Sequence, residues 1–265
     1  MTLFYPDVYH GNWPKTHTGP IPPIMFAKAT EGTDFADAHY ADYKLWAAQN
    51  GIFFGAYHFL RTGNEAAQAA WCYQHVGGEV PLMVDVEKEG TDTPDIHSII
   101  AFINAYRAKG GNARLVYLPH WYWVDIGSPD LSWMNPVGLY VVSSNYPANG
   151  YSDNGPGWTG YGGINPLVWQ YTDNNGGLDY NAFRGPLSDF KTLMGVDMAD
   201  GLTTDQKIDQ LFTNANNIWV ATGHNLGEVL IALYQRTAFL DQIQTALSNG
   251  GTVTVTITGA PDAKS

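Results

Sequence analysis

The chain has 265 residues, of which 45% are hydrophobic and 14% are charged. This composition excludes a largely disordered chain, and the length is sufficient for one large domain with or without an extension. The formal net charge of −12 opposes binding to a phosphate backbone, so we expect no nucleic-acid partner.

Strands and helices are predicted to alternate along the first part of the chain. Apolar or β-branched runs predict strands at Ile24–Thr30, Ile52–Phe59, Val80–Glu87, Arg114–Leu118, Gly138–Ser143 and Leu167–Tyr171. Helical spacing that stops near glycine predicts helices at Ala36–Asn50, Glu65–Val76 and Pro94–Ala108. This alternation indicates an α/β fold with a mainly parallel sheet and helices outside it. The number of units favours a closed or nearly closed barrel, and the loss of helices after residue 120 makes that barrel irregular.

The composition changes after Gly195, which predicts a barrel over residues 1–194 and a helical extension over residues 195–265. The extension should contain helices at Thr203–Asn217 and Asn225–Asn249 and a strand at Thr252–Thr258. The longer helix carries a heptad stripe with two polar breaks, made of Leu226, Leu230, Leu233, Thr237, Leu240, Gln244 and Leu247. Such a stripe docks on the barrel or joins copies of the chain, and we favour self-association.

Two carboxylates end the apolar segment Pro81–Glu87. Because residues i and i+2 of a strand point to one face, Asp85 and Glu87 should share a side, with roughly 6–7 Å between their backbones. The C-terminal ends of barrel strands are where active sites gather. Two neighbouring carboxyls in a partly apolar cleft acquire different pKa values, and glycoside hydrolysis needs such a pair. Taken alone, the pair also fits a metal site, a salt-bridged pair or a loop cap.

Further segments occur in a fixed order around this pair: Ala27–Thr33, Gly55–Phe59, Val84–Glu87, Leu115–Pro119 with Tyr117, Leu139–Ser143, and Trp169–Tyr171 followed by Leu178–Asn181. Together they resemble glycoside hydrolase family 25, the muramidase lysozymes of bacteria, fungi and phages. The resemblance covers roughly residues 3–190 and implies an irregular (β/α) barrel of the glycosidase type.

The resemblance implies roles for four acidic residues. Glu87 would be the general acid that protonates the leaving oxygen. Asp85 would stay ionised and would stabilise the acetamido group of the substrate, which then serves as the internal nucleophile. Asp7 and Asp179 would line the cleft, and their charges would help to keep Glu87 protonated.

The resemblance also implies substrate-binding residues, namely Tyr57, Tyr117, Trp169 and Glu31. Of these, Glu31 is equally interpreted as a capping residue. The first motif departs from the family pattern, because Asp7–Gly11 is shorter and lacks a serine, and this departure affects outer subsites instead of the central pair. Lys28 and His58 are expected to face the barrel interior or to pair with acids.

The implied activity is hydrolysis of the β-1,4 bond between N-acetylmuramic acid and N-acetylglucosamine in peptidoglycan. The partner would be a glycan strand, and the reaction needs no cofactor and no metal, since the histidines lack ligand spacing. The alternative is a glycan-binding or structural protein that keeps the barrel without cleaving.

Delivery of the enzyme is a separate question. The N-terminal residues lack the basic start and apolar run of a signal peptide, so we expect no signal peptide. No run of residues is apolar for long enough to cross a bilayer, so we expect no membrane-spanning segment. With the heptad stripe, this favours a lysin of the phage virion (tail), joined to itself or to other phage structural proteins through residues 203–265. The alternative is a soluble endolysin released to the host cell wall.

Overall fold

The computed structural model describes residues 1–13 and 19–196. The predicted tail helices, the heptad stripe and the terminal strand lie outside the described residues, so the division into residues 1–194 and 195–265 stays a prediction. Across the described ranges, no helix is both long and apolar enough to span a membrane.

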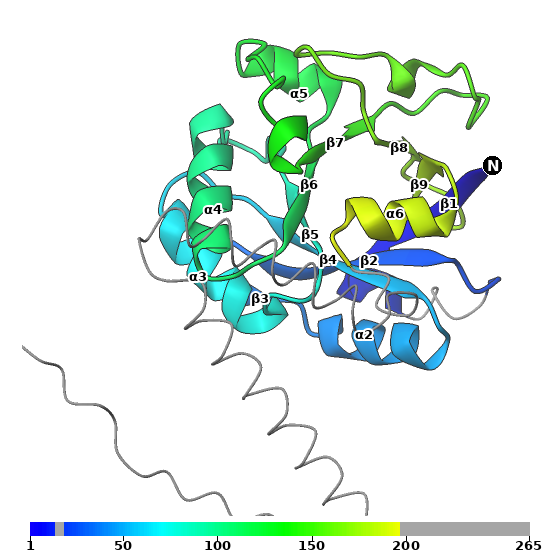
Figure 1. The fold of residues 1–265 in the computed structure, drawn as a ribbon, viewed down its shortest axis with the longest axis horizontal. Coiled ribbons are helices and arrows are strands. Elements are labelled where there is room, and N and C mark those ends of the chain that lie inside the picture. The colour runs from blue at the N-terminus through cyan, green and yellow to red at the C-terminus, as the bar shows by residue number, and fades with distance from the viewer. Residues whose placement is uncertain (14–18, 197–265) are drawn as a thin grey trace, which may run out of the picture. The chain divides into compact units, whose positions relative to one another are not determined.

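Strands from the whole described chain form one sheet that closes into a barrel (Figure 1). The order of neighbours is β1-β9-β8-β7-β6-β5-β4-β2-β3, and pairing of β1 with β2 closes the ring and leaves β3 at its edge. The strands are β1 Thr2–Val8, β2 Ile24–Glu31, β3 Phe35–Ala36, β4 Phe53–Phe59, β5 Leu82–Asp85, β6 Ala113–Tyr117, β7 Tyr140–Ser144, β8 Val168–Thr172 and β9 Asp179–Arg184. The predicted irregular α/β barrel is therefore confirmed.

Within the ring, the strands from β1 through β2 and β4 to β8 run parallel to their neighbours, whereas β9 runs antiparallel to both β1 and β8. Consequently the first residue of β9 lies at the end of the barrel where the parallel strands finish. The interior is apolar between the strand starts and this rim, and its core includes Tyr5, Phe26, Leu115 and Val168.

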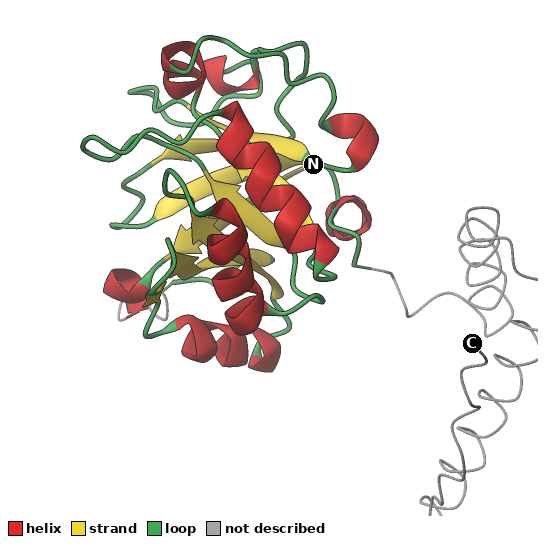
Figure 2. Cartoon of the chain, turned by 90° about the vertical axis from the view of Figure 1, so that its left-hand side faces the viewer, coloured by secondary structure: helices red, strands yellow, loops and turns green. Residues whose placement is uncertain are grey.

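Helices cover the outside of the strands (Figure 2). They are α2 Tyr40–Gln49, α3 Glu65–Val76, α4 Ile96–Ala108, α5 His120–Asp125 and α6 Leu187–Leu193, with 3-10 turns η1 His10–Asn12, η2 Asn135–Val137 and η3 Pro156–Trp158. A second apolar core lies between the strands and α2, α3 and α4. By contrast, α6 directs Phe190 into the interior core, where its ring contacts Tyr5, Phe53 and Phe183.

Several predicted boundaries need correction. The helix predicted from Ala36 begins only at Tyr40, because Phe35–Ala36 pairs with the end of β2 and the Asp37 carboxylate accepts the backbone N–H of His39. The strand predicted through Glu87 ends at Asp85. Leu167–Tyr171 was the last strand predicted for the barrel, but β9 follows it and is inserted between β8 and β1.

Candidate active site

A pocket opens where the parallel strands end. It is lined by Asp7, Tyr9, Lys28, Tyr57, Phe59, Met83, Asp85, Glu87, Tyr117, Tyr146, Gln170 and Asp179. All four acidic residues singled out in the sequence therefore lie in one pocket, together with two of the predicted binding residues, Tyr57 and Tyr117. Strand register explains the convergence: Asp7 is opposite Asp179 on β9, and Asp85 is aligned with Tyr117 on β6.

Asp85 is buried at the end of β5. Its Oδ1 atom is buried and finds no hydrogen-bond partner among the described residues. Burial raises the pKa of Asp85 well above its ordinary value, and the nearby carboxyls of Glu87 and Asp7 raise it further, whereas Lys28 lowers it. An anionic Asp85 thus requires a hydrogen-bond donor or a positive charge in the pocket.

Glu87 is half-buried and lies just beyond β5. Burial raises the pKa of Glu87 to about 7, with further contributions from the charges of Asp7 and Glu89. A carboxyl with this pKa is substantially protonated near neutral pH, which is the state that a general acid needs.

Asp7 is buried but well supplied with donors. Its Oδ2 atom accepts hydrogen bonds from Asn181 Nδ2 at 2.6 Å and from Gln170 Nε2 at 3.0 Å. Burial raises the pKa of Asp7, whereas these two amide donors lower it. Because the donors favour the charged form, Asp7 is the best site for a negative charge in the pocket.

Two tyrosines fix the orientation of the Gln170 amide. Tyr117 Oη donates to Gln170 Oε1 at 2.9 Å, and Tyr146 Oη donates to the same oxygen. With its carbonyl occupied by hydroxyls, Gln170 turns its NH₂ group toward Asp7. The tyrosine pair thereby stabilises the charge on Asp7 indirectly, through the orientation of Gln170.

Asp179 completes the acidic cluster. Burial raises its pKa to about 8, and repulsion from Asp7 is the next largest cause. Together with the raised pKa values of Asp85 and Glu87, this indicates that the pocket holds protons at neutral pH and that the four carboxyls are not all ionised.

The structure corrects two predicted binding residues. Trp169 is fully buried outside the pocket, where its Nε1 atom donates to the carbonyl of Asn145 and its ring packs against Tyr151 and Trp158. Side chains alternate along β8, so Gln170 faces the pocket and Trp169 faces away. Glu31 lies beside the pocket without lining it, and its carboxylate binds Lys28 and Arg61 instead.

Lys28, Tyr9, Tyr146 and Gln170 were not predicted as site residues. Side chains alternate between the two faces of the predicted strand Trp169–Tyr171, and this alternation could have indicated Gln170. Tyr146 lies on a loop after β7, where no such pattern exists. Tyr9 belongs to the first motif, the one that departs from the family pattern.

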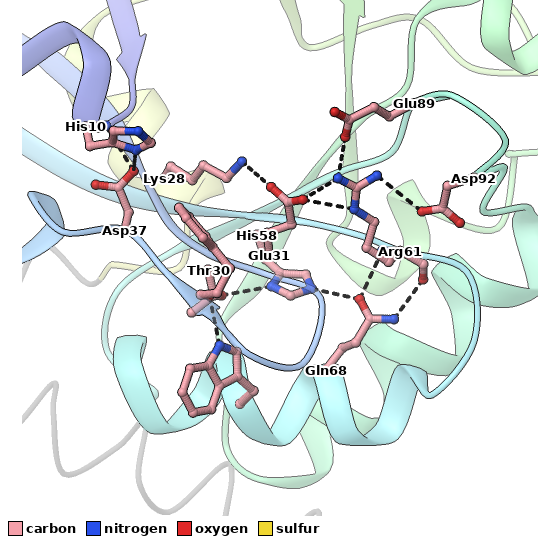
Figure 3. Close-up of polar contacts among 12 residues, drawn as sticks. His10, Lys28, Thr30, Glu31, Asp37, His58, Arg61, Gln68, Glu89 and Asp92 are labelled. Atoms are coloured by element: carbon pink, nitrogen blue, oxygen red, sulfur yellow. Dashed lines mark hydrogen bonds and ion pairs between the residues drawn. The ribbon is translucent and has the colours of Figure 1, made fainter.

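His58 was expected to face the barrel interior or an acid, and it does neither. It lies under the helices, where Nδ1 pairs with Thr30 Oγ1 at 2.8 Å and Nε2 pairs with Gln68 Oε1 at 3.2 Å (Figure 3). The ring also stacks on Phe102. Burial lowers the pKa of His58 to about 3, so it is neutral and structural. No group of three or more potential metal ligands occurs in the described part of the chain.

Comparison with known proteins gives a consistent result. The family described as "Glycosyl hydrolases family 25" matches residues 7–178. Similar solved structures include a family 25 lysozyme from Aspergillus fumigatus, with 20% identity, coverage of 73% of this chain and 99% of that chain, and a TM-score of 0.59. A lysozyme from Streptomyces coelicolor has 21% identity, coverage of 73% and 96%, and a TM-score of 0.55. The endolysin catalytic domain from bacteriophage P40 of Listeria monocytogenes has 15% identity, coverage of 74% and 98%, and a TM-score of 0.54. No curated protein sequence matches the chain.

The hydrogen bond from Asn181 to Asp7 leads to a prediction about protonation. Replacing Asn181 with Ala removes a donor to the charged form, so the pKa of Asp7 should rise. Glu87 should respond in the opposite direction, because a less ionised Asp7 repels its charge less. Titration of ¹³C-labelled side-chain carboxyls by NMR measures both shifts. The exposed Asn174→Ala variant serves as the control and should leave both pKa values unchanged; an unshifted Asp7 in Asn181→Ala would refute the assignment.

Proposed function

The chain belongs to glycoside hydrolase family 25, and we propose that it hydrolyses the β-1,4 bond between N-acetylmuramic acid and N-acetylglucosamine in bacterial peptidoglycan. The observation that carries the proposal is the pairing of Glu87, whose pKa is raised to about 7, with the buried Asp85 in one pocket at the barrel rim. One carboxyl can then deliver a proton while the other stabilises positive charge, as glycoside hydrolysis requires.

In the first step, Glu87 donates its proton to the glycosidic oxygen as the bond between that oxygen and the anomeric carbon of the muramic acid breaks. The carbonyl oxygen of the substrate's own acetamido group then bonds to the anomeric carbon. In the second step, the Glu87 carboxylate takes a proton from water, whose oxygen attacks the same carbon and releases the acetamido oxygen. Glu87 is thereby protonated again, and the acetamido group of the substrate is restored.

Asp85 would act on the acetamido group. Its buried Oδ1 atom, which lacks a partner in the described chain, is suited to accept the acetamido N–H. That hydrogen bond would favour the anionic form of Asp85, and the anion would stabilise the positive charge that develops as the ring is formed. Bound substrate therefore supplies the donor that the free pocket does not provide among the described residues.

We infer a phage virion (tail) lysin as the setting for this activity. The support is the predicted heptad stripe of residues 225–249, since an apolar stripe of that kind fits assembly into a homo-oligomer or onto other phage structural proteins. The alternative settings are a soluble endolysin and a catalytically silent glycan-binding virion protein. Endolysin catalytic domains share the fold, which is compatible with the first of these.

The assembly hypothesis predicts an oligomer. Sedimentation of the full chain at micromolar concentration should give a species larger than the monomer, and Leu230→Asp with Leu233→Asp should return it to the monomer by placing charge in the stripe. The exposed Leu45→Asp change on α2 is the matched control. A monomeric full chain would reject self-association and leave docking onto other phage structural proteins or the soluble endolysin.

The assignment of Glu87 as general acid predicts a large loss of activity in Glu87→Gln. The amide cannot donate a carboxylic proton, so turnover on purified cell wall should fall by about two to four orders of magnitude. Glu79→Gln, an exposed change of the same chemistry, should retain full activity. Circular dichroism should show both variants folded. A Glu87→Gln variant that keeps more than roughly a tenth of the wild-type rate would exclude the role.

The raised pKa of Glu87 predicts the alkaline limb of the pH profile. As pH rises through about 7, Glu87 loses its proton and the general acid is lost, so kcat/KM should fall tenfold per pH unit above that point. Measurement on soluble glycan chains avoids effects from charges on an intact wall. An activity that stays constant up to pH 9 would show that another group supplies the proton.

A further inference from the structure

We propose that Lys28 is a positioning residue for the reaction: its ammonium, anchored by Glu31, is the counter-charge that favours the anionic form of Asp85 against the repulsion of the other carboxyls in the pocket. The proposal rests on the proposed function, because it assigns the electrostatic balance of the same pocket. It concerns a residue for which the sequence indicated only a structural role.

The charge distribution in the pocket singles out Lys28. Among the described side chains that line the pocket, four are carboxyls and Lys28 is the only cation. Its side chain is 15% exposed, so solvent screens its charge only partly. A unit charge in such a site acts more strongly on its neighbours than one on an open surface.

The path of β2 directs Lys28 into the pocket. Its backbone aligns with pocket-lining Tyr57 on β4, and a register shift between Lys28 and Thr30 follows at once. Because of this irregularity, Thr30 aligns with His58 under the helices, and Glu31 aligns with Phe59 on the pocket side. Without the extra residue, strand alternation would place Thr30 beside Lys28 and turn Glu31 outward.

The ammonium of Lys28 is held by defined contacts. Lys28 Nζ donates to Glu31 Oε2 at 2.5 Å (Figure 3). The same atom lies 5.0 Å from the ring centroid of Phe59 and 5.3 Å from that of Phe35. The negative faces of these rings favour a cation without neutralising it. Lys28 is therefore fixed in place and still presents its charge to the pocket.

Glu31 is itself held by Arg61. Arg61 Nε donates to Glu31 Oε1 at 3.0 Å, and the same guanidinium pairs with Glu89 and Asp92. Burial raises the pKa of Glu31, but the hydrogen bonds from Lys28 and Arg61 outweigh it, and the pKa lies below its ordinary value. The ionised form of Glu31 is thus favoured, and its charge balances part of the charge of Lys28.

The groups around Asp85 and Glu87 show why this balance matters. The carboxyls of Asp7 on β1 and Asp179 on β9 face Asp85, and Asp7 and Glu89 act on Glu87, all disfavouring further negative charge. The phenols of Tyr57 on β4 and Tyr117 on β6 contribute no positive charge. Of the described charged groups that change the pKa of Asp85 or Glu87, Lys28 is the one that opposes this repulsion, because its positive charge lowers the pKa of each.

The first test is the pH profile of kcat/KM for Lys28→Met. The acid limb follows the ionisation of Asp85, and the alkaline limb follows the loss of the proton from Glu87. Loss of the cation raises the pKa of both groups, so both limbs should move to higher pH by roughly one unit. At a fixed pH on the acid limb the rate should fall about tenfold, because less Asp85 is ionised. Lys28→Arg keeps the charge and should keep the limbs. If Lys28→Met only lowers the rate and both limbs stay at their wild-type pH, the proposal is wrong.

The second variant reverses the sign. Glu31→Gln removes an anion and frees the charge of Lys28, so both limbs should move to lower pH, which a merely structural loss would not produce. The exposed Asp42→Asn change on α2 is the matched control and should leave the limbs in place. Limbs that move in the same direction in Lys28→Met and Glu31→Gln would also overturn the proposal.

Carboxyl titration by ¹³C NMR separates this proposal from the proposed function. In the full chain without substrate, the signals of Asp85 and Glu87 should titrate at higher pH in Lys28→Met and at lower pH in Glu31→Gln. If the wild-type chain releases no glycan, the proposed function fails and this titration still decides the role of Lys28. Unshifted titrations in both variants would reject that role whatever the activity.

Discussion

Repulsion among carboxyls in one partly buried pocket is the interaction on which the chemistry of this barrel depends. Asp7, Asp85, Glu87 and Asp179 lie too close and too deep to be ionised together, so the pocket retains protons at neutral pH. The distribution of those protons is set by local donors. Amides from Asn181 and Gln170 favour charge on Asp7, whereas no described donor reaches the buried Oδ1 of Asp85.

The topology of the barrel creates this crowding. Parallel strands place Asp7 and Asp85 at one rim, because both residues stand at or near the ends of their strands. A ninth parallel strand would have carried its first residue to the opposite end. Since β9 is antiparallel, Asp179 at its start lies at the same rim, directly opposite Asp7. The reversal that closes the ring therefore also supplies the fourth carboxyl, and α6 fills the interior with Phe190.

Much of this arrangement followed from the sequence, and the exceptions have physical causes. Apolar runs and helical spacing located most of the strands and the helices α3 and α4, and the Asp85–Glu87 pair predicted the position of the pocket. Strand β9 was missed because its residues mix polar and apolar faces without a clear period. The family resemblance pointed to Trp169, whereas side-chain alternation along β8 places its neighbour Gln170 in the pocket. The role of Glu31 depended on a register shift in β2 that no local pattern indicates.

The most direct measurement is the identity of the new reducing end that the full chain produces from purified peptidoglycan. Digestion followed by borohydride reduction and mass spectrometry converts that sugar into its alditol. Cleavage on the anomeric side of muramic acid, with Glu87 as the acid, predicts N-acetylmuramitol as the new terminus. Appearance of N-acetylglucosaminitol instead, or no new reducing end at all, would contradict the proposed reaction.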